Sequence, residues 1–164
     1  MMLLAYTSSN NFKLFQMDVK SAFLNGFISK EVSVEQPLGF ENSLLLNHVF
    51  ILTKALYRLK QAPRAWYERL SSFLISNNFT KCKVDTTLFI KHFKNNFFIV
   101  QIYVDDIIFG SLNESLCELF AKCMSHEFEM SLMGELTFFL GLQVKQLSDD
   151  IFLNQTKYTL DLLK

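Results

Sequence analysis

Apolar and polar residues follow two different periods along this chain, and each period predicts one kind of secondary structure. Alternation with period two, or a short apolar run bounded by turn residues, indicates a β-strand. The segment FKLFQMDV is a run of this kind, and it ends in a carboxylate at Asp18. The same signals predict strands at residues 12–19, 31–35, 48–53, 87–93, 97–104, 107–110, 136–145 and 151–155.

A period of 3.6 residues predicts the helices. Residues 63–77 carry one apolar face, and Asn77-Asn78 can end that helix in a left-handed cap. The tetrapeptide SLNE at 111–114 has the pattern of a capping box, which predicts a second helix that runs through Phe128. The last residues, 156–164, predict the start of a third helix.

The order of these elements predicts the fold class. Asn95-Asn96 and Asp149-Asp150 are expected to form turns between antiparallel strands. Reduced to its main elements, the order is β-α-β-β-α-β, which is the order of a split ferredoxin-like sandwich. We therefore expect an α+β fold with an antiparallel sheet and with the helices on one face of it.

Composition predicts one folded domain over residues 1–164. Half of the 164 residues are hydrophobic and 18 are Phe, whereas Pro and Gly together are too few for a long flexible linker. No apolar stretch approaches the roughly 18 residues that a membrane span needs, so no membrane association is expected. Cys82, Cys117 and Cys123 are odd in number and lack metal-ligand spacing, which predicts free thiols without a disulfide partner.

Charge is distributed unevenly, although the formal net charge is zero. Residues 51–94 hold nine basic and two acidic side chains, a difference of +7, and residues 95–164 hold four basic and ten acidic, a difference of −6. A basic middle segment is compatible with a phosphate backbone as partner. A solvated lysine-rich face explains the charge equally well.

The tetrapeptide Tyr103-Val104-Asp105-Asp106 carries the most chemical information. Two adjacent carboxylates between apolar runs need compensation, and hard divalent cations prefer carboxylate oxygen. An exposed hairpin turn is the alternative, because Asp is a good turn former. Asp18 also ends an apolar strand, and in a sandwich order that strand can lie beside the Asp105-Asp106 turn. Three carboxylates at one end of a sheet suit two metal ions about 3.5–4 Å apart, which can activate a hydroxyl and hold a leaving pyrophosphate.

Five stretches together resemble the successive palm motifs of copia-type reverse transcriptases, in the order of that family and over nearly the whole chain. LKQAPRAWY combined with YVDD is highly specific. The five stretches are QMDVKSAFLNG (16–26), VEQPLGF (34–40), LKQAPRAWYERL (59–70), IYVDDIIFGS (102–111) and MGELTFFLGLQVKQ (133–146).

The resemblance implies a role for individual residues. It makes Asp18, Asp105 and Asp106 the catalytic carboxylates that bind Mg²⁺, with Mn²⁺ as a possible substitute. It makes Phe23 the bulky residue that screens the sugar 2′ position, and Gln61 a contact of the incoming nucleotide. Ordinary core packing and a polar residue at a helix start are the plainer alternatives for these two. Primer or template contacts are implied for Tyr103, Lys60, Arg64, Phe139, Leu140 and Gly141, of which the last three belong to the FFLG stretch at 138–141.

The implied function is RNA-directed DNA synthesis from dNTPs on an RNA or DNA template with a primer. The family implies an intracellular location, either cytoplasmic, particle-associated or nuclear. Two alternatives stay open at this point. One is a decayed and inactive transposon remnant, and the other is a nucleotide cyclase-like sandwich domain, which would not explain LKQAPRAWY.

The chain departs from the family pattern at three places. Arg58 in ALYRLKQ occupies a position where the family has glycine, and a glycine there usually marks a positive φ or a close backbone approach. A glycine that the family tends to place near Asp150 is also absent. Finally, the chain begins inside the family's domain and stops before its thumb and RNase H regions, so the fingers start is expected to be missing. We therefore expect the isolated chain to be inactive or very weak.

Overall fold

The computed structural model describes residues 2–94, 96–147 and 150–163. Its internal contacts divide the chain into two compact units, a division that the composition did not indicate. The first unit comprises Met1–Lys20 and Leu74–Lys164, and the second comprises Ser21–Phe73. In the described ranges, none of the helices is long and apolar enough to cross a membrane.

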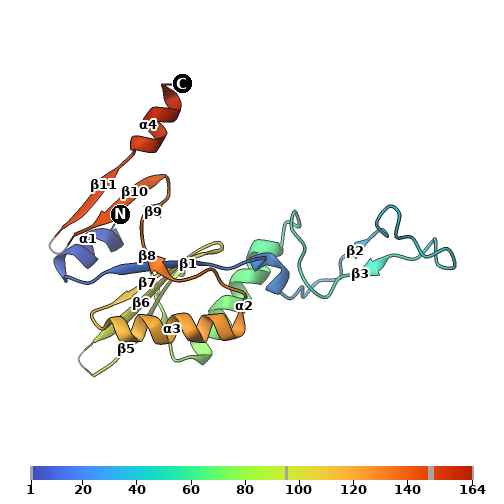
Figure 1. Cartoon of the computed structure of the whole chain (residues 1–164). Coiled ribbons are helices and arrows are strands. Elements are labelled where there is room, and N and C mark those ends of the chain that lie inside the picture. Colours follow the sequence, from blue (N-terminus) through green and yellow to red (C-terminus); the bar gives the residue numbers. More distant parts are fainter. Residues whose placement is uncertain (1, 95, 148–149, 164) are drawn as a thin grey trace. The chain divides into compact units, whose positions relative to one another are not determined.

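A six-stranded antiparallel sheet forms the centre of the first unit (Figure 1). β7 (Asp106–Ser111) pairs with β6 (Phe97–Tyr103) on one side and with β1 (Leu14–Asp18) on the other, so β1 and β7, which are distant in sequence, become neighbours. The predicted strands at 12–19, 87–93, 97–104 and 107–110 are thereby confirmed. In spatial order the strands are β4 (Thr80–Lys81), β5 (Leu88–His92), β6 (Phe97–Tyr103), β7 (Asp106–Ser111), β1 (Leu14–Asp18) and β8 (Gly134–Glu135).

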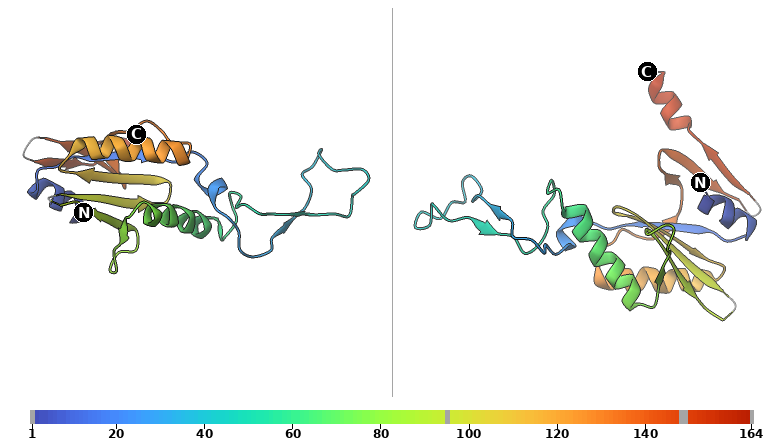
Figure 2. Two further views of the ribbon diagram at one scale, coloured as in Figure 1. Left: turned by 90° about the horizontal axis from the view of Figure 1, so that it is seen from below. Right: turned by 180° about the vertical axis from the view of Figure 1, so that it is seen from behind.

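Helix α3 (Glu114–Glu127) covers one face of this sheet (Figure 2). The ring centroid of Phe120 lies 4.9 Å from that of Phe109 on β7 and 5.1 Å from that of Phe98 on β6. Phe79 adds its ring to the same group, 5.7 Å from Phe120. Aromatic pairs at such distances stabilise the packing beyond their buried area alone, so this cluster fixes α3 on the sheet.

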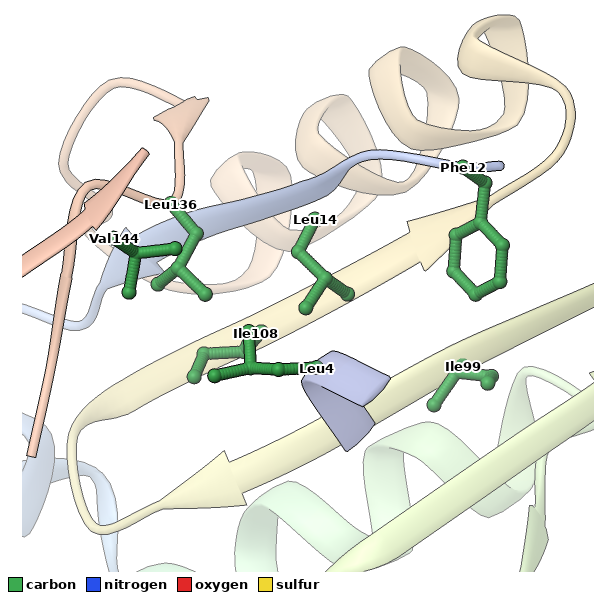
Figure 3. Packing of buried hydrophobic residues seen from close by; sticks show 7 residues of the cluster. All are labelled: Leu4, Phe12, Leu14, Ile99, Ile108, Leu136 and Val144. Atoms are coloured by element: carbon green, nitrogen blue, oxygen red, sulfur yellow. The ribbon is translucent and has the colours of Figure 1, made fainter. Parts of the chain in front are cut away.

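The opposite face is covered by helix α1 (Met2–Ser9) and by β10 (Leu142–Gln146), a strand of a second sheet (Figure 3). Side chains on neighbouring positions of a strand point to opposite faces, so Ile99 and Ile108 face away from the Phe98–Phe109 side. Leu4 of α1 is buried with them. The expectation that the helices lie on one face is therefore only partly right, because α1 packs on the other face.

The segment at 136–145, expected as one strand, is divided in the structure into β9 (Phe138–Phe139) and β10 (Leu142–Gln146). Leu140 and Gly141 have φ of +50° and +80°, so the chain reverses there. β10 pairs antiparallel with β11 (Ile151–Asn154), as predicted, and α4 (Thr156–Leu162) follows. The expected turns at Asn95 and at Asp149 involve residues outside the described ranges.

The predicted capping box at 111–114 is wrong. Asn113 caps α3, because its side-chain oxygen accepts a hydrogen bond from the N–H of Ser115. Ser111 is the last residue of β7, and its hydroxyl donates to the carbonyl of Phe97. An asparagine one residue before the helix was an equally good cap, and the strand pairing of Ser111 decided between them.

The second unit contains η1 (Ala22–Asn25), β2 (Ser33–Val34), β3 (Phe50–Ile51) and most of α2 (Ala62–Ser76). The long helix predicted at 63–77 is confirmed. Gly26 allows a close approach, because a Cβ atom there would lie 2.7 Å from the nitrogen of Trp66 and 2.8 Å from the carbonyl carbon of Ala65. Asn78 has φ +64°, which confirms the predicted left-handed cap after α2.

Candidate active site

Strand pairing in the first unit brings Asp18 and the two carboxylates of the YVDD stretch to one end of the sheet. Asp18 is the last residue of β1, and Asp106 is the first residue of β7. These two residues lie directly opposite each other in the β1–β7 register. Asp105 lies in the two-residue turn, Val104-Asp105, that joins β6 to β7.

Backbone hydrogen bonds show that Asp18 and Asp106 form a close pair. The N–H of Val19 donates to the carbonyl of Asp105, at 3.1 Å, whereas the N–H and carbonyl of Asp18 bond to Ser131 on the other side. Asp18 and Asp106 are therefore a non-hydrogen-bonded pair, in which Cα atoms are about 4.5 Å apart and the side chains approach most closely. Like charges placed directly opposite in this way are destabilising.

The electrostatics of the carboxylates agree with that proximity. Burial raises the pKa of Asp106 above its usual value, and the charges of Asp105 and Asp18 raise it further. The pKa of Asp18 is also raised, first by burial and then by the charge of Asp105. The nearby ammonium of Lys20 lies 3.0 Å from Glu129, and among the described residues no ion pair involves Asp18, Asp105 or Asp106.

These carboxylates fit a partial metal shell. Within the described ranges, no group of three or more His, Cys, Asp or Glu side chains is arranged to hold a metal ion. Mg²⁺ in phosphoryl-transfer sites is usually bound by one or two carboxylates, with substrate phosphates and water as the other ligands. The Asp18–Asp106 pair, with Asp105 beside it, matches that donor chemistry, and a cation would relieve the repulsion between the charges.

Tyr103 and the FFLG stretch meet beside this pair. Tyr103 is paired with Asp106 across the hairpin, and its ring lies 6.0 Å from that of Phe139 in an edge-to-face arrangement. In the turn between Tyr103 and Asp106, Val104 has φ +59°. A β-branched residue in this region is a genuine outlier, which indicates a strained turn beside the carboxylates. The structure therefore brings Tyr103 and Phe139 together from two separate motifs.

The remaining predicted residues belong to the second unit. Phe23 lies in η1 and is half-buried, with its ring centroid 5.0 Å from that of Tyr57. Lys60, Gln61 and Arg64, from the residues just before α2 and its first turn, line a cavity of about 340 Å³. Other parts of its wall come from Phe27, Ile28, Ser29, Lys30, Ala65 and Glu68.

Arg58 has a left-handed backbone, which confirms the prediction made from the missing glycine. Its φ is +72°, and the N–H of Leu59 donates to the carbonyl of Leu56 across it. A turn with this hydrogen bond and a positive φ only at its third residue has the pattern of type II, which favours glycine at that place. The Arg58 side chain is exposed to solvent.

Three structural features of the site were not found by sequence reasoning. Ser131 holds the backbone of Asp18, and its position in the loop after α3 gives no local signal. Tyr57 contacts Phe23 only through the tertiary fold. The positive φ of Val104 could have been found, because a two-residue hairpin loop between paired strands requires a left-handed residue.

Comparison with known proteins agrees with these observations. Residues 1–164 match the family model described as reverse transcriptase (RNA-dependent DNA polymerase). The chain is 38% identical, over 148 residues, to the retrovirus-related Pol polyprotein from transposon RE1 of Arabidopsis thaliana. The matched region is 90% of this chain and 10% of that protein. The chain is 37% identical over 148 residues to the corresponding protein from transposon RE2 of the same plant, with the same two coverages.

A third relative is the retrovirus-related Pol polyprotein from transposon TNT 1-94 of Nicotiana tabacum, with 36% identity over 159 residues, 95% of this chain and 12% of that protein. The chain thus spans about a tenth of the length of these curated relatives. No solved structure matches it. The chain belongs to the reverse transcriptase (RNA-dependent DNA polymerase) family, as the copia-type reverse transcriptase region of a retrotransposon Pol polyprotein.

Proposed function

We propose that this chain carries the catalytic centre for RNA-directed DNA synthesis, with Asp18, Asp105 and Asp106 as its metal-binding carboxylates. The observation that carries the proposal is the Asp18–Asp106 pair, directly opposite each other on β1 and β7 with Asp105 on the adjoining turn. Two carboxylates that repel each other at the ends of paired strands, with Asp18 half-buried and Asp106 exposed, have no evident structural use. They are well suited to a cation that arrives with a nucleotide.

The reaction joins the 3′-hydroxyl oxygen of a primer to the α-phosphorus of a dNTP. The bond from that phosphorus to the bridging oxygen breaks, pyrophosphate leaves, and the hydroxyl proton passes to solvent. Bound Mg²⁺, or Mn²⁺ in its place, would lower the pKa of the hydroxyl and stabilise charge on the leaving oxygen. The carboxylates of Asp18, Asp105 and Asp106 would provide the fixed oxygen ligands for this chemistry.

Nucleotide selection is assigned to the second unit. Phe23 would place its ring against the sugar 2′ position and thereby exclude ribonucleotides, and Gln61 would contact the incoming nucleotide. The half-buried position of Phe23 supports this role, since the residue packs on the fold and yet remains partly accessible.

Primer and template contacts are assigned to two separate sets of residues. In the first unit, Tyr103 and the turn at Phe139, Leu140 and Gly141 would hold the primer end, which the ring contact of Tyr103 with Phe139 supports. In the second unit, Lys60 and Arg64 would contact nucleic-acid backbone at their cavity. Arg64 also pairs with Glu68 at 2.8 Å, but an exposed pair of this kind is weak and can yield to a phosphate.

The sheet order supports a palm of the split ferredoxin-like kind. Leaving out β4 and β5, the order β6-β7-β1-β8 places the first strand between the third and the fourth in the β-α-β-β-α-β sequence. This is the order of a ferredoxin-like sheet, with β4 and β5 added at one edge.

Primer extension tests the proposed function. The assay compares this region, carried within a longer Pol chain, with its Asp105→Asn variant on an RNA template with a DNA primer. Glu118→Gln, an exposed carboxylate of α3, is the matched control. We expect Asp105→Asn to lose at least about 100-fold in rate, because a metal ligand is removed, and Glu118→Gln to keep full activity. Equal rates for Asp105→Asn and the control would refute the assignment.

One observation favours a second candidate, an inactive copy that has drifted from the family pattern. Arg58 occupies a left-handed position for which arginine is a poor residue, three positions before Gln61. A strained turn at this place would disturb the nucleotide contact. Reversion of Arg58 to glycine in the longer chain distinguishes the two candidates, since an inactive copy with this lesion alone should regain activity.

A further inference from the structure

The ring of Phe23 is held on one side by small residues of the second unit. Ala55, Ala62 and Ala65 form a buried cluster, and Phe23 packs against it together with Ile28 and Leu59. Alanine side chains leave a flat and shallow surface, on which an aromatic ring can lie but from which it can also swing away. This side alone therefore does not fix the angle of the ring.

The backbone that carries Phe23 is anchored firmly. Gly26, which ends η1, donates its N–H to the carbonyl of Phe23 at 3.1 Å and accepts a hydrogen bond from the N–H of Ala55 at 2.8 Å. Gly26 is also pressed against the backbone of α2 at Ala65 and Trp66, where a Cβ atom would not fit. Any conformational freedom at Phe23 therefore belongs to its side chain, because its main chain is held in place.

Tyr57 contacts the ring of Phe23 directly. The two ring centroids are 5.0 Å apart and the ring planes are tilted by 51°. Tyr57 is 51% exposed, so core packing does not account for its aromatic side chain. It occupies the second position of the Leu56–Leu59 turn, next to Arg58 with its positive φ. The geometry of this turn therefore sets where the Tyr57 ring lies.

We infer that Tyr57 is a positioning residue for Phe23, and that through Phe23 it increases the preference for deoxynucleotides over ribonucleotides. The inference rests on the proposed function, which gives Phe23 its contact with the sugar. With Tyr57 in place, the Phe23 ring contacts both the alanine cluster and a second ring, so fewer of its rotamers are open. Without it, the Phe23 side chain gains rotamers in which a 2′-hydroxyl meets less obstruction.

The test measures nucleotide binding by the 164-residue chain itself, so it does not depend on polymerase activity. NMR titrations with Mg²⁺ give the affinities for dGTP and for GTP, which differ only in the 2′-hydroxyl. We expect the wild type to bind dGTP more tightly, and Tyr57→Leu to reduce the ratio of the two affinities by about three- to tenfold, the value of one aromatic pair. Tyr57→Phe keeps the ring and should keep the ratio.

The controls separate a positioning role from a general one. Tyr158→Leu removes another exposed tyrosine, on α4 of the first unit, and should leave the ratio unchanged. Leucine at position 57 retains apolar bulk, and the unfolding midpoint of each variant shows whether it is folded. The aromatic NMR signals of Phe23 should shift in Tyr57→Leu, which gives a second reading that does not require a nucleotide.

Each outcome has one meaning. A ratio unchanged in Tyr57→Leu but lowered in Phe23→Ala overturns the role of Tyr57 and leaves the proposed function in place. A loss of ratio in Tyr57→Phe as well would overturn the ring contact as its cause. Equal affinity of the wild type for the two nucleotides, or binding of neither, contradicts the role of Phe23 itself, and the inference fails with it.

Discussion

Replacing Arg58 with glycine should make this chain more stable, although the change removes a large side chain and adds no new contact. Arg58 has φ +72° at the third position of the Leu56–Leu59 turn. In this region the Cβ atom of an L-residue crowds the following carbonyl oxygen, and glycine has no such atom. The Arg58 side chain is exposed, so its removal takes little packing away.

The magnitude follows from two opposing terms. A non-glycine residue in the left-handed region costs about 1–2 kcal/mol. Glycine makes the unfolded chain more flexible, which costs about 0.4–1 kcal/mol of stability. The difference leaves up to about 1.6 kcal/mol in favour of Arg58→Gly, with roughly 0.8 kcal/mol at the centres of the two ranges. For a chain of this length, that central value corresponds to an increase of about 2–3 °C in the unfolding midpoint.

The assay is thermal unfolding followed by circular dichroism, with two controls in the same unit. Arg58→Ala removes the guanidinium but retains the Cβ atom, so it should not raise the midpoint as Arg58→Gly does. Gly39→Ala is the reverse test, because Gly39 has φ +82° and an added Cβ there would meet no atom within 4 Å. It should therefore lower the midpoint through the backbone alone.

Two results would refute the reasoning. If Arg58→Ala stabilised the chain as much as Arg58→Gly, the side chain and its charge would be responsible, not the backbone. If Gly39→Ala had no effect while Arg58→Gly stabilised, a positive φ would carry no cost in this unit, and another cause would be needed.

Four further predictions follow from the structure. Calorimetry should show weaker Mn²⁺ binding to Asp105→Asn than to the wild type, and equal affinities would place the ion elsewhere. Hydrogen bonds from Thr87 hold the pKa of Asp85 below its usual 3.8, so Asp85→Ala should cost up to about 1 kcal/mol at pH 7. That cost should vanish as the pH falls through the lowered pKa, and a cost that persisted at pH 2 would exclude the ionised carboxylate as its source. The side chain of Gln146 accepts a hydrogen bond from the N–H of Leu14 and donates one to its carbonyl, both at 2.8 Å. Gln146→Leu should therefore destabilise the first unit by about 2–3 kcal/mol in denaturant unfolding. A change below about 0.5 kcal/mol would mean that water replaces the lost hydrogen bonds. Primer extension by the isolated 164-residue chain, wild type or Arg58→Gly, should stay near background beside a longer Pol chain, because a misplacement of about 1 Å can cost roughly 100-fold; robust extension would show this region to be self-sufficient.

Local sequence determined most of the secondary structure and one backbone conformation. The apolar run before Asp18 and the helix after Lys60 lie where their patterns predicted, whereas the turn expected at Asp105-Asp106 lies one residue earlier, at Val104-Asp105. The left-handed backbone of Arg58 was predicted from the resemblance, because the family has glycine at that place. The periodicities that predict strands and helices are complete within a few residues, so the sequence alone carries them.

Tertiary structure decided how these pieces meet. Nothing near Asp18 indicates that it pairs with Asp106 rather than with a neighbouring residue, because register is set by the packing of two strands far apart in the chain. The position of α1 on the second face, the cap at Asn113 and the contact of Tyr57 with Phe23 were decided in the same way. Each depends on competition between partners distant in sequence, and local propensity gives no information about which partner wins. The candidate carboxylates could therefore be named from the chain, but only the fold decided how they lie relative to one another.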